Sequence, residues 1–98
     1  MPAYIIVDVK IHNEEKYSVY RSLTPASIKK YDGRFVVRGG NTEVIEGSWK
    51  PERLVIIEFP TIERAKEWWN SPEYSAIKKI RHENAESNML LIEGYNDV

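Results

Sequence analysis

Polar and apolar residues alternate at the start of the chain and then recur at helical spacing. Residues 3–11, AYIIVDVKI, are rich in β-branched side chains and predict a strand. Asn13 then serves as a predicted N-cap, and acidic residues fill the first helical turn, where the helix dipole favours them. Three residues at helical spacing predict the buried side of this helix: Tyr17, Tyr20 and Leu23.

The first helix is predicted to stop and restart at Thr24-Pro25. Threonine can cap a new helix, and proline suits the first helical position. Asp32-Gly33 ends the helical segment. Residues 34–38 and 42–47 then have strand spacing, interrupted by Gly39-Gly40.

The second half of the chain repeats this strand and helix pattern. Residues 53–59 predict a third long strand, and Thr61 caps a helix that carries Ala65, Trp68 and Trp69. Ser71 and Pro72 begin a last helix, as cap and first residue, that runs to about Ala85. Residues 88–95 predict the closing strand.

The order βαββαβ predicts one ferredoxin-like α+β domain over residues 1–98, with an antiparallel sheet and both helical segments on one face. Side chains alternate along a strand, so each strand contributes to two faces. The face beneath the helices is predicted to hold Ile5, Val7, Val9, Ile11, Phe35, Val37, Val55, Ile57, Phe59, Leu90 and Ile92. The open face is predicted to hold Tyr4, Ile6, Asp8, Arg34, Val36, Arg38, Leu54, Ile56, Glu58, Met89, Leu91 and Glu93.

The predicted open face mixes aliphatic side chains with charged ones. A half-solvated antiparallel sheet is one interpretation, although such sheets usually alternate apolar and polar residues cleanly. A second copy covering the face in a two-fold homodimer is the other, and it is the one we favour. Charged groups trapped in that interface would have to pair or bind a polar ligand.

Composition narrows the classes of function. Apolar residues make up 42% of the chain and charged residues 30%, with a formal net charge of -1, so neither nucleic acid nor an anionic membrane is the expected partner. The chain has no cysteine, and its 2 histidines lack metal-ligand spacing, so no metal or other cofactor is expected. The N-terminal apolar run is too short to span a bilayer and lacks signal-peptide flanks, which favours a cytoplasmic location.

Five segments together resemble the bacterial family catalogued as domain of unknown function thirteen-thirty: AYIIVDV, EKYSVYRSLTP, DGRFVVRGG, VIEGSWKPERLVIIEFPTIERAKEWWNSPEYSAIKKIR and LLIEG. The most specific pieces are Arg-Gly-Gly at 38–40, Glu-Gly at 46–47, IEFP at 57–60, and SPEY followed by Arg81. Asp32 stands where the family usually has another glycine, and Trp69 stands where it commonly has tyrosine.

The resemblance implies membership of the dimeric α+β barrel superfamily, which includes muconolactone isomerases and the antibiotic-biosynthesis type of monooxygenase. It implies a ferredoxin-like subunit whose sheet packs face to face with that of a second copy and encloses a cavity. The family's own description supplies no reaction.

Arg38 beside Gly39 and Gly40 is the first candidate site residue. An arginine binds a carboxylate through two parallel hydrogen bonds, and glycines let a ligand approach the backbone. Glu58 in the apolar strand LVIIEF, and Glu46 before Gly47, are candidate acids or bases. The alternative for these groups is a structural ion pair, and Gly39-Gly40 could instead form a hairpin turn.

Four further residues are candidate substrate contacts: Tyr20, Trp69, Tyr74 and Arg81. The aromatic residues could shape a pocket mouth, but aromatic residues at helical spacing are also typical of core. Arg81 could reach the pocket or lie on the helix surface.

The leading hypothesis is a cytoplasmic homodimer with a small-molecule site between its subunits. If it is an enzyme, cofactor-independent proton transfer of the isomerase type is expected, with Arg38 holding an anionic group and a glutamate moving the proton. A cofactor-free monooxygenase is the competing enzyme class. A non-catalytic binding module and a purely structural dimer remain open.

Overall fold

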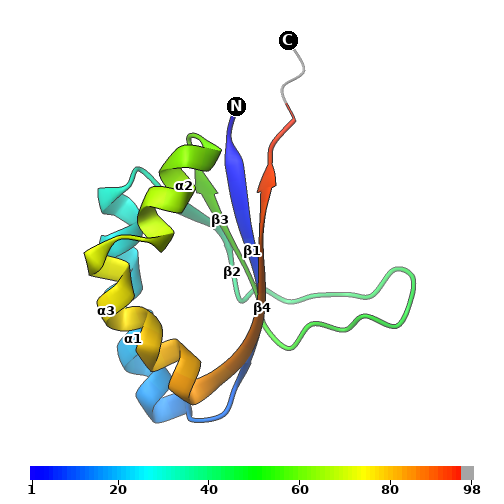
Figure 1. Ribbon diagram of the computed structural model, residues 1–98. Helices are drawn as coiled ribbons and strands as arrows, with labels where there is room; N and C mark the ends of the chain where they lie inside the picture. The colour runs from blue at the N-terminus through cyan, green and yellow to red at the C-terminus, as the bar shows by residue number, and fades with distance from the viewer. Residues whose placement is uncertain (96–98) are drawn as a thin grey trace.

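The computed structural model describes residues 1–95, and the last three residues of the predicted domain, 96–98, lie outside them. Three helices and four strands follow one another along the chain (Figure 1). Their bounds are β1 Ala3–Ile11, α1 Glu14–Lys30, β2 Arg34–Arg38, β3 Leu54–Phe59, α2 Ile62–Trp69, α3 Pro72–Asn84 and β4 Ala85–Glu93.

The strands form one antiparallel sheet in the order β2-β3-β1-β4. All three helices lie on the same side of this sheet, and the other side has no helix over it (Figure 1). This arrangement confirms the predicted ferredoxin-like α+β fold. α2 and α3 together occupy the place of the second helix, divided at the predicted Ser71-Pro72 step.

Three of the four predicted helix caps, Asn13, Thr61 and Ser71, are confirmed. The side chain of Asn13 accepts a hydrogen bond from the backbone N–H of Lys16 at 3.0 Å. Thr61 and Ser71 cap α2 and α3 in the same way, each at 3.1 Å. These bonds satisfy backbone donors that a helix N-terminus leaves without partners.

The predicted restart of the first helix is wrong, because α1 continues through Pro25. Thr24 does not cap a helix; its buried hydroxyl donates to the carbonyl of Tyr20 at 2.6 Å. A proline inside a helix lacks the N–H that would bond the carbonyl four residues earlier. That carbonyl belongs to Arg21 and is free to accept another donor.

The core lies between the helices and the sheet. β1 and β3 bury alternate residues, and α2 and α3 bury aromatic ones, so that Trp68 and Tyr74 stack with ring centroids 3.9 Å apart. The largest fully buried side chains are Trp68, Tyr74, Phe59, Ile28 and Val9. Their burial is the main apolar contribution to the stability of the fold.

A β-bulge in β2 overturns the predicted facing of its last two residues. Phe35 pairs with Ile57, but Val37 pairs with Ile56 and Arg38 with Val55, so the register shifts by one residue at Val36. A one-residue shift moves side chains to the opposite face. Arg38 therefore lies on the helix side of the sheet and Val37 on the open side, the reverse of the prediction.

The predicted facing of β4 is also wrong. Met89 pairs with Val7, and Leu91 pairs with Ile5, so both lie on the helix side. Leu90 and Ile92 lie on the open side and are 56% and 49% exposed. The strand also begins at Ala85 rather than at residue 88.

Residues 39–53 form a long arm that extends away from the helices, beyond the open face of the sheet (Figure 1). The predicted strand over residues 42–47 is absent from this described segment. Asp8 of β1 anchors the arm, because its carboxylate accepts from Trp49 Nε1 at 3.0 Å and from the backbone N–H of Glu52 at 3.1 Å. Ile45 and Trp49 remain 89% and 62% exposed.

Candidate functional site

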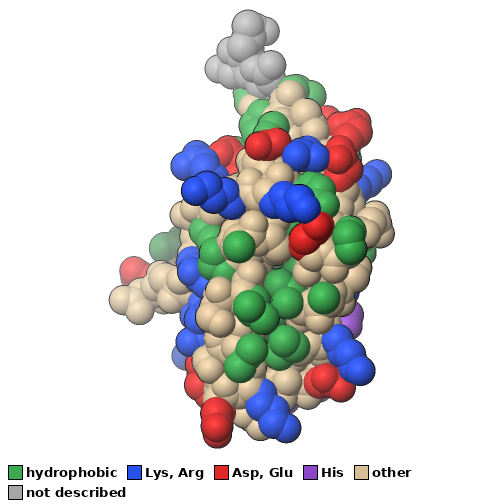
Figure 2. Space-filling model, turned by 90° about the vertical axis from the view of Figure 1, so that its left-hand side faces the viewer, with side chains coloured by type: hydrophobic (Ala, Val, Ile, Leu, Met, Phe, Trp, Pro, Cys, Tyr) green, Lys and Arg blue, Asp and Glu red, His purple; other side chains and the backbone are tan. Residues whose placement is uncertain are grey.

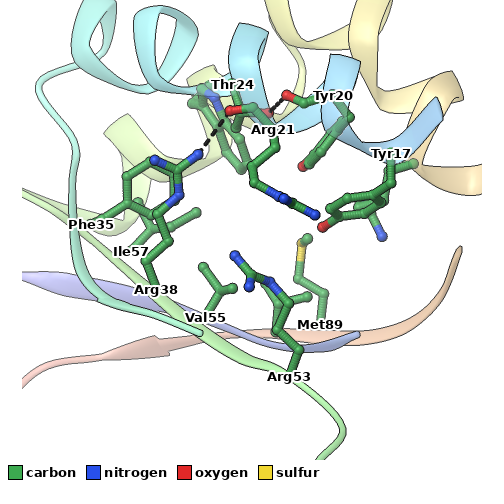
Figure 3. Close-up of a pocket in the computed structure, with 13 residues that line it drawn as sticks. Tyr17, Tyr20, Arg21, Thr24, Phe35, Arg38, Arg53, Val55, Ile57 and Met89 are labelled. Carbon is green, nitrogen blue, oxygen red and sulfur yellow. Dashed lines mark hydrogen bonds between the residues drawn. The ribbon is translucent and has the colours of Figure 1, made fainter. Parts of the chain in front are cut away.

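A small pocket lies between α1 and the sheet, inside the subunit (Figure 3). Its free volume is about 30 Å³, enough for roughly two water molecules. The pocket is lined by residues from all three helices and from the four strands or the segments beside them: Val7, Tyr17, Tyr20, Arg21, Thr24, Phe35, Arg38, Arg53, Val55, Ile57, Trp68, Arg81 and Met89. The pocket is on the opposite side of the sheet from the cavity that the sequence analysis expected.

Four of the lining residues are arginines, and none is acidic. Arg21 comes from α1, Arg38 from the end of β2, and Arg53 from the residue before β3. Figure 3 shows the guanidinium groups of Arg21 and Arg53 directed into the same space from opposite sides. The remaining arginine, Arg81 of α3, is only 4% exposed.

Pro25 determines where Arg38 is held. The Arg21 carbonyl, which has no helical N–H donor because residue 25 is proline, accepts a hydrogen bond from Arg38 Nη2 at 2.8 Å. The Arg38 guanidinium also lies 4.3 Å from the centroid of the Phe35 ring, a cation–π contact. The proline within α1 thus positions the Arg38 guanidinium at the pocket.

Gly39 makes room for Arg53. Its φ of +72° lies in the left-handed region, and a Cβ at this position would overlap the Arg53 guanidinium. Only glycine adopts such a backbone without strain. The neighbouring Gly40 has no atom within 4 Å of its Cβ position, so it does not shape the pocket.

Two arginine nitrogens in this pocket are buried without a hydrogen-bond acceptor: Nε of Arg21 and Nε of Arg53. Arg21 also pairs with Glu14 through Nη2. No ion pair among residues 1–95 includes Arg38, Arg53 or Arg81. Buried donors without acceptors are costly, and uncompensated positive charge attracts an anion.

A chain of hydroxyl groups leads from Arg81 to the pocket. Arg81 Nε lies 3.3 Å from the Tyr74 hydroxyl, which lies 2.8 Å from the Tyr20 hydroxyl. Tyr74 is fully buried, whereas Tyr20 lines the pocket. Burial raises the pKa of Tyr20 far above its usual value, and the neighbouring Tyr74 adds to this effect, so Tyr20 stays protonated.

A family model described as Domain of unknown function (DUF1330) matches residues 2–95, nearly the whole chain. The chain belongs to this family. The resemblance found in the sequence is therefore confirmed. No curated protein matches the chain.

Several solved structures have a similar fold. A protein of unknown function from Rhodopseudomonas palustris has a TM-score of 0.76 at 17% identity, over 97% of this chain and 83% of that one. SnoaB, a cofactor-independent oxygenase from Streptomyces nogalater, has a TM-score of 0.68 at 10% identity, over 99% and 96%. A dimeric protein of unknown function from Bacteroides fragilis, with a ferredoxin-like fold, has a TM-score of 0.55 at 19% identity, over 95% and 96%. At these identities the likeness shows the fold alone.

The structure brings some of the sequence-predicted site residues together. Arg38, Tyr20 and Arg81 line the pocket. The Tyr74 hydroxyl is hydrogen-bonded to that of Tyr20. Gly39 does not line the pocket but lies against the guanidinium of Arg53, which does. Their roles stay predictions. The other candidates, Gly40, Glu46, Glu58 and Trp69, do not line this pocket of the DUF1330 chain.

Glu58 lies on the open face in an ion pair. Its carboxylate accepts from Arg34 Nε at 2.7 Å and from the Tyr4 hydroxyl at 3.0 Å. The hydrogen bond from Arg34 and the one from Tyr4 hold the pKa of Glu58 below its usual value. A depressed pKa favours the ion-pair interpretation of this glutamate over a general base.

Glu46 and Trp69 lie in two other places. Glu46 is exposed on the arm. Trp69 is half-buried at the end of α2, where it lines an apolar groove beside β4 and where the Lys78 ammonium lies 3.6 Å from its ring centroid. Trp69 therefore lines a surface separate from the arginine pocket.

Three pocket residues, Arg21, Arg53 and Tyr17, were not predicted as site residues from the sequence. Arg21 lies one residue after the predicted buried Tyr20, and Arg53 was placed in a strand without a role. A sequence signal exists for Arg21, which stands four residues before Pro25 and therefore has the carbonyl that loses its helical donor. Arg53 approaches Gly39 only in space, because the two residues are far apart in sequence.

No group of three or more metal-ligating side chains occurs among residues 1–95. Over the same residues, no helix is both long and apolar enough to cross a membrane.

Proposed function

We propose that each subunit binds a small organic anion, with a carboxylate as its charged group, in the arginine pocket. The observation that supports this most directly is the convergence of Arg21, Arg38 and Arg53 on a space that no acidic side chain lines. Two buried Nε donors in that space lack acceptors. A carboxylate supplies two acceptor oxygens and suits the planar guanidinium group.

The pocket also sets the size and polarity of the ligand. Phe35, Val55 and Ile57 form an apolar floor beneath the arginines, which favours a ligand with an apolar body. The free volume of about 30 Å³ is smaller than a typical ligand site. Arg21 and Arg53 have long, flexible side chains, so a ligand of one ring enters when these two side chains move outward.

We also propose that the protein is a homodimer that covers the open face of the sheet. Four aliphatic side chains from three strands lie together on that face: Ile6, Ile56, Leu90 and Ile92. The structural neighbour from Bacteroides fragilis is described as dimeric. Each subunit would keep its own pocket, because the pocket lies on the other side of the sheet.

Proton transfer by Glu58 is not part of this proposal, because that carboxylate lies on the open face and is held by Arg34 and Tyr4. Arg38 keeps the role that the sequence suggested, as the group that holds the anion. Cofactor-independent chemistry remains compatible with the pocket, and the SnoaB neighbour is described as a cofactor-independent oxygenase.

The binding test compares benzoate with benzamide, which has the same ring but no charge. Calorimetry and thermal shift are expected to show binding of benzoate and not of benzamide. Arg53→Gln is expected to weaken benzoate binding about tenfold or more, the usual value of a charge-assisted hydrogen bond. Arg38→Gln is expected to have a similar effect.

Lys79→Gln is the matched control, because it removes the same charge from an exposed position on α3. Its benzoate affinity is expected to stay within about twofold of that of the unchanged protein, since screening weakens distant surface charges. Equal stabilisation by benzamide and benzoate, or unchanged benzoate affinity in Arg53→Gln, would contradict the proposal.

A further inference from the structure

Arg81 is a buried cation whose hydrogen-bond partners are all neutral or weakly basic. Its Nε reaches the Tyr74 hydroxyl, Nη1 reaches the Ser87 hydroxyl, and Nη2 lies 3.2 Å from His82 Nε2. No carboxylate pairs with it among residues 1–95. A buried charge of this kind is stabilised by oriented dipoles around it or by an anion nearby.

The positive charge gives the hydroxyl chain a direction. A guanidinium group can only donate, so the Tyr74 oxygen accepts from Arg81. The Tyr74 proton then has one acceptor in reach, the Tyr20 oxygen at 2.8 Å. The opposite direction would leave the proton of the fully buried Tyr74 without an acceptor, which is costly.

This direction leaves the Tyr20 proton free to donate into the pocket. The Tyr20 oxygen accepts from Tyr74, and Arg81, which can only donate, also lies within hydrogen-bond reach of it. Tyr20 lines the pocket together with Arg21 and Arg53. Burial keeps Tyr20 protonated, because it raises the pKa of the phenol well above the physiological range. The pocket therefore presents one neutral O–H donor whose hydrogen-bond chain ends at a buried cation.

A donor of this kind is suited to an oxygen that gains negative charge. Preorganised donors in sites that exclude water stabilise an oxyanion more strongly than a neutral carbonyl. The guanidinium of Arg81 strengthens the effect, since it polarises the two hydroxyls in the same direction.

We propose that the ligand of this pocket carries an ionisable oxygen in addition to its carboxylate, and that Tyr20 donates its hydrogen bond to that oxygen. The ligand class is a hydroxyaromatic carboxylate or an enolisable oxo acid. On ionisation the ligand's proton leaves to water, the oxygen becomes a phenolate or enolate, and Tyr20 keeps its own proton. This inference rests on the proposed anion binding.

The probe is 4-hydroxy-3-nitrobenzoate, whose phenolate form absorbs visible light. Its ionisation is titrated by absorbance, free and with the protein in excess, so the pKa of the bound phenol is read directly. We expect this pKa to be lower when the probe is bound than when it is free. Tyr20→Phe is expected to raise the bound pKa by about one unit or more, because it removes one hydrogen bond to a charged oxygen.

Tyr31→Phe is the matched control. Tyr31 directly follows the same helix and donates its hydroxyl to Glu73, and it does not line the pocket. The pKa of the phenol bound to Tyr31→Phe is expected to equal that of the phenol bound to the unchanged protein. Tyr74→Phe keeps the Tyr20 hydroxyl and breaks the chain behind it, so we expect a smaller rise than for Tyr20→Phe. Tyr74→Phe also provides the test if Tyr20→Phe fails to fold.

Benzoate separates this inference from the proposal on which it rests. Because benzoate lacks the ionisable oxygen, Tyr20→Phe is expected to bind it within about twofold of the unchanged protein. If benzoate fails to bind the unchanged protein, both proposals are wrong. If benzoate binds but Tyr20→Phe leaves the bound pKa of the probe unchanged, the anion site stands and the role of Tyr20 is overturned.

Discussion

At the scale of single residues, the pocket depends on two backbone exceptions. Pro25 withholds an N–H from the Arg21 carbonyl, which then holds Arg38, and Gly39 leaves the space that Arg53 fills. Neither residue has a polar side chain. Pro25 acts through its missing N–H and Gly39 through its missing Cβ, and the side chains of Arg38 and Arg53 occupy the acceptor and the space that result.

Gly39→Ala tests this dependence. The added Cβ would overlap the Arg53 guanidinium, and the φ of +72° disfavours alanine by about 1–2 kcal/mol. We expect a lower free energy of unfolding in urea and weaker benzoate binding, because Arg53 must move away.

Gly40→Ala is the control for this substitution. A Cβ at Gly40 meets no atom within 4 Å, so binding and stability should both be nearly unchanged. If the two variants bind benzoate equally well, the space at Gly39 is not needed for the position of Arg53.

Residue type alone predicted part of this site. Arg38 was recognisable because arginine, glycine and glycine stand together after a strand. Glu58 was misleading, since a carboxylate in an apolar strand has the same pattern whether it is a base or a partner of Arg34. The partner lies 24 residues away in sequence, and only the register of β2 and β3 brings the two together.

At the scale of elements, capping residues and apolar periodicity predicted the starts of α1, α2 and α3 correctly, because these signals act within one turn. The faces of β2 and β4 could not be predicted in the same way. A bulge at Val36 and the pairing of β4 with β1 determine them, and both depend on contacts between distant segments. The continuous α1 has the same cause, since packing against α3 outweighs the local preference of proline.

The contact between α1 and α3 predicts a dependence of stability on pH. Lys30 at the end of α1 lies 2.5 Å from Glu73 at the start of α3, and the Tyr31 hydroxyl donates to the same carboxylate at 2.7 Å. The bond from Lys30, followed by that from Tyr31, lowers the pKa of Glu73 from 4.5 to about 2. A carboxyl group whose pKa is lower in the folded protein stabilises the folded state at pH values above its pKa in the unfolded chain. This stabilisation is lost as the pH falls towards the pKa in the folded protein.

Glu73→Gln is therefore expected to lower the Tm by a few degrees at pH 7, and the difference should shrink between about pH 4.5 and pH 2. Thermal unfolding followed by circular dichroism at several pH values measures this. Glu83→Gln, on the exposed side of α3 and outside the ion pairs of the described chain, should show no such trend. A constant Tm difference down to pH 2 would contradict the role of Glu73.

At the scale of the whole molecule, one side of the sheet is covered by helices and the other is open (Figure 1). The helix side closes over the core, although Val19 and Leu23 of α1 remain 49% and 45% exposed. Figure 2 shows apolar side chains gathered on this side of the molecule. The open side carries aliphatic residues of three strands and the anchored base of the arm. The proposed homodimer would bury the open side.

Leu90→Glu tests that proposal, because it places a charge next to Ile6 among the aliphatic side chains of the open face. We expect sedimentation velocity to show dissociation to single chains, since a buried unpaired carboxylate is costly. Val19→Glu introduces the same charge on the helix side and should leave the dimer intact. Dissociation by Val19→Glu and not by Leu90→Glu would place the interface on the helices instead.

The bulge in β2 determines which side of the sheet Arg38 faces. Arg38 faces the helix side only because Val36 stands outside the regular ladder, so that Arg38 pairs with Val55. Regular pairing of all five residues of β2 would turn Arg38 to the open side with no change of sequence. Affinity at this pocket therefore depends on the hydrogen-bond register of one edge strand as well as on the identity of its side chains.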